Sequence, residues 1–207
     1  AGASGPSGDD LRREAIRLAR AVSGLMPDEA EVAGLLALLL LAESRWPARF
    51  AGDGALVLLR TQDRDLWDRS MIAEGQAIVR ACLRRNQPGP YQIQAAINAV
   101  HADAASFEAT DWSQILALYD QLYAIAPNAV VALNRAVAVA EIDGHAAALE
   151  LVDALDLAEY YPFHATRADL LRRLHRNEEA VAAYERAAAL TENGTERAFL
   201  QRRARSL

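Results

Sequence analysis

The chain has 207 residues, a formal net charge of −6 and a hydrophobic content of 52%. This apolar content argues against a disordered chain, and the single cysteine, Cys82, excludes a disulfide scaffold and a cysteine-rich zinc site. All basic side chains are Arg, and the absence of Lys excludes Schiff-base chemistry and a lysine-dependent phosphate-binding loop. A composition rich in Ala, Leu, Arg and Glu predicts an all-α protein.

The acidic side chains are concentrated in the middle of the chain. Residues 103–160 contain ten Asp and Glu side chains and one basic residue, Arg135. Such a segment repels phosphates, so we expect no direct contact of this chain with nucleic acid. No apolar stretch is long enough to cross a membrane, and the small residues at 1–8 indicate a linker, not a signal peptide. We therefore expect a cytoplasmic protein that does not contact a membrane.

Apolar residues at helical spacing predict a first helix that starts near Asp9 and a second that starts near Pro27. The second helix has almost no polar face over residues 35–41, so we expect it to be central. The pattern changes after Trp46, and residues 55–60 are typical of an extended segment. Further helices are expected over about 65–85, 91–103 and 112–126.

The C-terminal part contains a repeat. Arg135-Ala136 recurs 32 residues later as Arg167-Ala168, and Ala148 and Ala180 stand at the same interval. Each copy reads as a helix, a polar turn and a second helix, with small residues where the two helices cross. This pattern resembles tetratricopeptide repeats, and Thr195 to Leu207 fit the capping helix that such arrays need.

The expected architecture is an all-α array of helical hairpins. An N-terminal helical half covers residues 9–110, and tetratricopeptide-like repeats with a capping helix cover 111–207. The two halves are expected to pack together as one continuous domain.

Two polar clusters are candidates for an interaction or ligand-binding site. The first comprises Gln62, Asp63, Arg64, Trp67 and Asp68. Its acids are explained by a helix start, with Asp65 as N-cap, Asp68 in the first turn and an arginine paired to a carboxylate. That explanation accounts less well for the gathering of Gln62, Arg64 and Trp67, so an interface or a ligand site stays open beside it.

The second cluster comprises Tyr91, Gln94, Asn98 and His101, of which the last three share one helical face. This face is expected either to be buried against another segment, because buried amides need partners, or to line a groove. Asn134 and Arg135 on a later helix are candidates for the same kind of surface.

No pattern in the sequence predicts catalysis. The four His residues have no metal-ligand spacing, and no nucleophile or dinucleotide motif is present. We therefore expect no catalytic residue, no metal and no cofactor. A deep pocket that placed His101 beside Asp63 or Asp68 would favour an enzyme instead.

Taken in chain order, several stretches resemble the C-terminal extension of a group of bacterial extracytoplasmic-function sigma factors. The most specific of these are Gln62 to Asp68 and Gly89 to Ile97; the others are Asp9 to Arg20, Pro27 to Glu29, Leu35 to Leu41 and Leu133 to Ala140. In those proteins a helical, tetratricopeptide-like domain follows the two promoter-recognising domains, and it stands where other sigma factors use a separate anti-sigma partner.

The resemblance implies a regulatory domain of transcription initiation. Its partners would be the sigma domains of the same polypeptide, RNA polymerase core through them, and a peptide or small effector. This chain contains no helix-turn-helix, so the promoter-recognising parts would precede Ala1. The alternative is a free-standing tetratricopeptide-like scaffold that binds peptides around Asn134 and Arg135.

Overall fold

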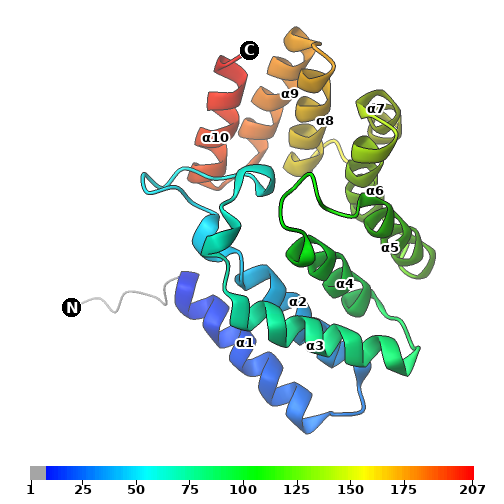
Figure 1. Cartoon of the computed structure of the whole chain (residues 1–207). Helices are drawn as coiled ribbons and strands as arrows, with labels where there is room; N and C mark the ends of the chain where they lie inside the picture. Colours follow the sequence, from blue (N-terminus) through cyan, green and yellow to red (C-terminus); the bar gives the residue numbers. More distant parts are fainter. Residues whose placement is uncertain (1–7) are drawn as a thin grey trace. The chain divides into compact units, whose positions relative to one another are not determined.

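The computed structural model describes residues 8–207 and is all-α over that range (Figure 1). The one pairing of extended backbone in the described part is an isolated bridge between Phe50 and Leu56. The α-helices are α1 (Gly8–Leu25), α2 (Ala30–Glu43), α3 (Arg69–Arg85), α4 (Pro90–Asp103), α5 (Trp112–Ile125), α6 (Ala129–Ile142), α7 (His145–Asp153), α8 (Tyr161–Arg173), α9 (Asn177–Leu190) and α10 (Gly194–Arg205). Short 3₁₀ helices are η1 (Trp46–Ala48), η2 (Leu59–Thr61) and η3 (Arg64–Leu66).

The described residues form two compact units. Unit 1 comprises residues 8–49 and 59–111, and unit 2 comprises residues 50–58 and 112–207. The linker expected over residues 1–8 lies outside the described residues except for Gly8, with which α1 begins.

Helix α2 is the centre of unit 1, because α1, α3 and α4 all pack against it. Leu40 and Leu41 are fully buried in it. Two glycines let the neighbouring helices approach closely: a Cβ atom on Gly34 would lie 2.7 Å from Gln92 of α4, and one on Gly75 of α3 would lie 2.7 Å from Leu41. The expected central helix is therefore present, and small residues set its distance to two neighbours.

The segment 55–60 does not form a strand. The chain turns at Gly54, which has a φ of +80°, and Leu56 reaches only the isolated bridge to Phe50 before the chain enters η2. A single bridge gives no ladder of hydrogen bonds. The apolar residues of this segment are half-buried as a loop.

Unit 2 is a linear array in which each helix from α5 to α10 packs on the next. Helix α6 begins at Ala129 and α8 at Tyr161, while α7 begins at His145 and α9 at Asn177, so both helices of the pair recur after 32 residues. Residues at equivalent positions of the two copies are buried alike: Ala136 and Ala168 at 0%, Ala148 and Ala180 at 0%, and Val152 and Tyr184 at 0% and 3%. The repeat read from the sequence is thus a structural repeat of helical hairpins.

Candidate functional site

The first polar cluster stands on η3 and the start of α3. The Asp63 carboxylate accepts a hydrogen bond from the Asp65 backbone N–H at 2.9 Å and caps η3. The Asp68 carboxylate accepts from the backbone N–H groups of Ser70 and Met71 at 2.9 and 3.0 Å, so Asp68 is the N-cap of α3. The expectation that Asp65 caps this helix is wrong, because η3 occupies the turn that would have been its first.

These hydrogen bonds also set the ionisation of Asp68. The Ser70 hydroxyl donates to the same carboxylate oxygen at 2.6 Å. This bond and the backbone N–H of Met71 lower the pKa of Asp68, because both stabilise the charged form. Asp68 is therefore a charged helix cap.

Arg64 binds the end of α4. Its Nη1 donates to the backbone carbonyls of His101 and Ala104, each at 2.6 Å, and its guanidinium lies 4.7 Å from the centre of the Trp67 ring. The last carbonyls of a helix have no partner within it and carry partial negative charge. Arg64 thus caps the C-terminal end of α4, and the expected pair between Arg64 or Arg69 and a carboxylate is formed by Arg69 with Asp65 at 3.7 Å. Burial lowers the pKa of the Arg64 guanidinium.

Two donor atoms of this cluster are buried without a hydrogen-bond partner among residues 8–207. They are Nη2 of Arg64 and Nε1 of Trp67, whose residue is 2% exposed. An unpaired buried donor costs about 1–3 kcal/mol, so most such groups in proteins are matched by a partner or by ordered water. Their presence side by side marks this region as the candidate site.

A pocket of about 250 Å³ opens beside the same arginine, formed by the loop 60–65 and the loop that follows α4. We call it the Arg64 pocket; its lining residues are Arg60, Gln62, Asp63, Arg64, Asp65, Ala105, Ser106, Phe107 and Glu108. The Arg60 guanidinium lies 3.9 Å from the centre of the Phe107 ring. Two acids stand at the rim: the side chains of Asp65 and Glu108 are 97% and 71% exposed and pair with Arg69 at 3.7 Å and with Arg60 at 3.9 Å.

The pocket contains part of the predicted cluster. Gln62, Asp63 and Arg64 line it, whereas Trp67 and Asp68 are not among its lining residues. His101 does not line this pocket either, so the pocket does not place His101 beside Asp63. The contribution of the loop 105–108 was missed, because it has no periodic pattern and meets Arg64 only through the fold.

Side chains of the second cluster form hydrogen bonds with other residues of unit 1. Asn98 donates to the Gln94 carbonyl at 2.9 Å, and its side-chain oxygen accepts from Arg45 at 2.5 Å. The Gln94 side chain donates to the Pro90 carbonyl at 3.2 Å. Tyr91 is 45% exposed. Arg45, which follows α2, thus contacts the polar face of α4 at Asn98, and Gln94 bonds within its own helix.

His101 lies at the last turn of α4, near two arginines. Burial and the charges of Arg45 and Arg64 lower its pKa to about 4. Each of these influences disfavours the imidazolium ion. His101 is therefore neutral at physiological pH.

Sequence reasoning missed a contact at the other end of α4. The Glu31 carboxylate accepts hydrogen bonds from the backbone N–H of Tyr91 at 2.9 Å, from that of Gln92 at 3.2 Å, and from the Gln92 side chain at 2.9 Å. Gly89, the N-cap, has no side chain to do this. A Cβ atom on Gly89 would lie 2.3 Å from a Glu31 oxygen. The sequence signal for this contact is a helix that starts after Gly89, a residue without a side chain that could cap it.

Asn134 and Arg135 belong to unit 2. Asn134 is exposed on α6, and Arg135 donates to Asp120 of α5 at 2.6 Å. The equivalent Arg167 donates to Asp153 of α7, also at 2.6 Å. Arg135 therefore belongs to a repeated ion pair between consecutive helices.

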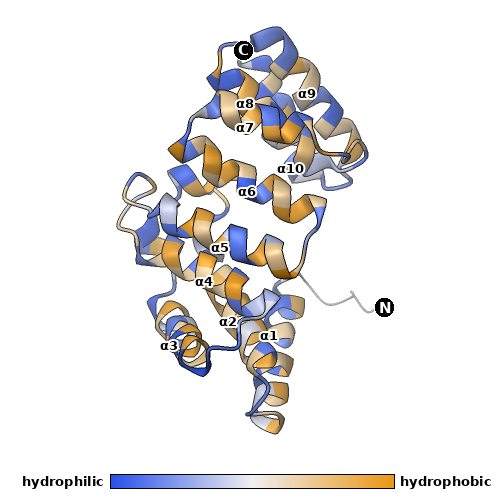
Figure 2. Ribbon diagram, turned by 90° about the vertical axis from the view of Figure 1, so that its right-hand side faces the viewer, coloured by the Kyte–Doolittle hydropathy of each residue, from blue (hydrophilic) through white to orange (hydrophobic). Residues whose placement is uncertain are grey.

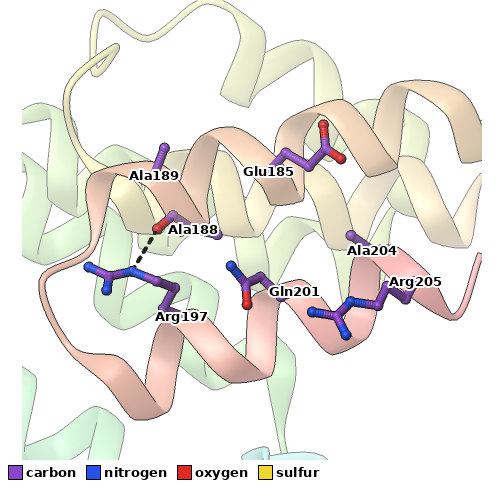
Figure 3. Close-up of a pocket in the computed structure, with 7 residues that line it drawn as sticks. All are labelled: Glu185, Ala188, Ala189, Arg197, Gln201, Ala204 and Arg205. Atoms are coloured by element: carbon purple, nitrogen blue, oxygen red, sulfur yellow. Dashed lines mark hydrogen bonds between the residues drawn. The ribbon is translucent and has the colours of Figure 1, made fainter.

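A larger pocket of about 500 Å³ lies between α9 and α10 (Figure 3). Arg197, Gln201 and Arg205 line it from α10, and Glu185 lines it from α9. Arg197 donates to the carbonyls of Ala188 and Thr191 at 3.3 and 2.6 Å. It thereby caps the end of α9 as Arg64 caps α4.

Two further features are absent from residues 8–207. No three His, Cys, Asp or Glu side chains in this range stand close enough to hold a metal ion. The same residues include no helix with the length and apolar character needed to cross a membrane.

Comparison with known proteins gives two matches. Residues 2–83, which end within α3, match the model of a family of unknown function (DUF6596). The chain is similar to an uncharacterized protein, R00370, of Rhizobium meliloti (strain 1021), with 49% identity over 202 residues, 96% of this chain and 48% of that protein. The chain thus spans about half the length of this relative. No solved structure matches it.

Proposed function

We propose that this chain is the regulatory domain of an extracytoplasmic-function sigma factor in the bacterial cytoplasm. It modulates transcription initiation, without catalysis of its own, by docking on the sigma domains of the same polypeptide and through them on RNA polymerase. The most specific support is the resemblance over Gln62 to Asp68 and Gly89 to Ile97. Residues 62–65 of the first stretch line the Arg64 pocket, and residues 90–97 of the second lie in α4, whose C-terminal end Arg64 caps.

The assignment of a docking site to this chain depends on the Arg64 pocket. Its lining residue Arg64 has a buried, unsatisfied donor atom, and two exposed acids, Asp65 and Glu108, stand at its rim. Domains that read promoter DNA are basic, because they neutralise phosphates. An acidic rim attracts such a domain and sets its orientation.

The length of the Rhizobium meliloti relative supports a multidomain protein. This chain covers 48% of it, which leaves more than half of that polypeptide for other domains. The helical-hairpin array of unit 2, whose tetratricopeptide-like character is part of this proposal, is a type of scaffold used for protein contacts.

The test is promoter-specific transcription by the full-length protein with polymerase core. Reversal of the rim charges, Asp65→Arg with Glu108→Arg, is expected to change the transcription rate about tenfold, the effect of roughly 1.4 kcal/mol in docking. The matched control is Glu192→Arg, an exposed acid of unit 2 outside the pocket. If the rim variant, Arg64→Ala and Gln94→Ala all transcribe like the unaltered protein, the docking assignment is wrong.

A free-standing peptide-binding scaffold is the second candidate. Asn134 is exposed on α6 between two exposed apolar residues, Val130 and Val137, and such a mixed face suits a bound peptide. The reading frame separates the two functions, since a sigma factor requires promoter-recognising domains in the same polypeptide.

A further inference from the structure

Helix α1 has two apolar faces, of which one is buried. Ile16 and Ala19 are 5% and 7% exposed and pack with Leu36 and Leu40 of α2. The other face, which we call the α1 seam, consists of Leu11, Ala15, Leu18, Val22 and Leu25. Its four large residues are 57%, 48%, 40% and 82% exposed, and Ala15 is exposed as well.

The seam has the spacing of a helix-packing surface. Its members follow one another at intervals of 4, 3, 4 and 3 residues, which is the heptad pattern that keeps side chains in one line along a helix. Figure 2 shows orange and pale orange stretches of ribbon along α1. Single exposed leucines are ordinary on protein surfaces, but a continuous line over the whole length of a helix indicates a missing partner.

The other terminal helix differs. Among the described residues, α10 contributes no large hydrophobic side chain to the exposed surface, and its apolar Leu200 is buried. Leu83 of α3 is 66% exposed, but it stands alone. Within residues 8–207, α1 exposes four large hydrophobic side chains, more than any other helix; α6 follows with Val130, Val137 and Ile142.

The charges beside the seam already have partners. Arg17 pairs with Glu14 at 2.7 Å and Arg20 pairs with Glu74 at 2.6 Å. Few unpaired charges are left to select a charged ligand, so recognition relies on apolar packing. The chemistry fits an amphipathic helix that brings its own line of apolar side chains.

The size of the seam favours a tethered partner. The 18 residues of α1 give a helix of about 27 Å by roughly 10 Å, so one face offers roughly 300 Å². Stable complexes between separate proteins bury about 800 Å² per partner. A second copy of this chain is therefore held too weakly by the seam alone, whereas a tethered partner acts at an effective concentration of about millimolar.

We infer that the α1 seam packs against an amphipathic helix from the part of the full-length polypeptide that lies outside this chain. The inference rests on the proposed function only in taking the partner from the same polypeptide. This chain covers 48% of its Rhizobium meliloti relative, and the rest of that polypeptide is long enough to contain such a helix. The seam and the Arg64 pocket are then two separate contacts with the rest of the protein.

The experiment compares amide hydrogen exchange of residues 8–25 in the full-length protein and in the 207-residue chain. Exchange in α1 is expected to be at least about tenfold slower in the full-length protein, since a docked helix opens less often. Leu18→Glu, and independently Leu25→Glu, should abolish this difference. Leu83→Glu, an equally exposed leucine outside the seam, should leave it unchanged.

Two results would overturn the inference. One is equal exchange of α1 in both proteins. The other is a dimer of the 207-residue chain that Leu18→Glu converts to a monomer, because a second copy would then be the partner. Transcription is not the readout, so a full-length protein that protects α1 but transcribes no promoter contradicts the proposed function alone.

Discussion

Units 1 and 2 satisfy the ends of their helices in different ways. In unit 1, Glu31 and Arg64 reach the two ends of α4 from positions 60 and 37 residues away along the chain. In unit 2, Asn128 caps α6 by accepting from the N–H of Val131 at 2.8 Å, and Asn193 caps α10 by accepting from that of Thr195 at 2.9 Å. Unit 1 thus adds distant contacts at α4 to local caps such as Asp68 of α3, whereas the caps of α6 and α10 in unit 2 are local.

This difference decides how each unit responds to a change. Contacts between residues far apart in the chain form only when several helices are already in place, so their loss affects all of them. A periodic array is stabilised by contacts between neighbouring helices, and a change there is felt mainly by its own hairpin. Variants in the two units should therefore differ in how far their effects spread.

The largest effect is expected for Arg64→Ala in unit 1. The substitution removes two short hydrogen bonds to carbonyls of α4 and the contact with Trp67. A hydrogen bond to a charged group contributes about 1.5–3 kcal/mol, so we expect a loss of about 3 kcal/mol in the free energy of unfolding, measured by urea denaturation. Faster amide exchange should extend beyond α4 to α2 and α3. Asp65→Ala, whose side chain is 97% exposed, is the matched control and should change stability by under about 0.5 kcal/mol.

A smaller effect is expected for Ala168→Leu in unit 2. Ala168 is fully buried at the crossing of α8 with its neighbours, and overpacking a site of this kind costs about 1–3 kcal/mol. The increase in exchange should stay within α8 and α9. Ala182→Leu on the exposed side of α9 is the control. If Ala168→Leu loosens α5 and α6 as much as α9, the description of unit 2 as a chain of local contacts is wrong.

The smallest predicted effect is a pH dependence of the free energy of unfolding, which should differ between the two units. The pKa of His101 is about 4 in the fold against an ordinary 6.5, so the unfolded state binds more protons between these values and the stability of unit 1 falls as pH falls below 6.5. Between pH 7.5 and 5.5 we expect a loss of about 1 kcal/mol for one such group. The measurement is urea denaturation at both pH values, and His101→Gln should remove most of the difference.

The half-buried acid of unit 2, Asp169, should not cause a similar loss of stability between pH 7.5 and 5.5. Burial acts to raise the pKa of Asp169, but hydrogen bonds and charges from Arg172 and Arg173 outweigh it and lower the pKa below 3.8. Its contribution to stability is therefore complete above pH 3.8 and is lost only as the pH falls through the lowered value. Equal losses in both units between pH 7.5 and 5.5 would contradict this contrast.

The parts of the fold that follow from local pattern were predictable. The helix expected over 112–126 is α5 (Trp112–Ile125), the 32-residue interval recurs in the helix starts, and the expected cap over 195–207 is α10 (Gly194–Arg205). Each depends on the spacing of apolar and small residues within a few turns. The start of α3 was misplaced because Asp65 and Asp68 are equally good capping residues, and nothing in the local sequence shows that Asp65 belongs to the preceding 3₁₀ turn η3.

The candidate site was predictable only in its composition. The sequence placed Gln62, Asp63 and Arg64 together, but the acceptors of Arg64 are carbonyls of residues 101 and 104, and every helix ends in carbonyls. The role of Glu31 was hidden for the same reason, since its partners are mostly backbone groups. The functional meaning of these residues stays a prediction until docking is measured.

The 32-residue repeat has a consequence for how this architecture changes in length. Arg135 with Asp120 and Arg167 with Asp153 join each hairpin to the helix before it in the same manner. A whole extra copy inserted between α7 and α8 would recreate these junctions, whereas an insertion of half that length would leave one helix without its counterpart. Duplication or deletion of complete hairpins is therefore the step by which such a protein gains or loses surface while α10 still closes the end.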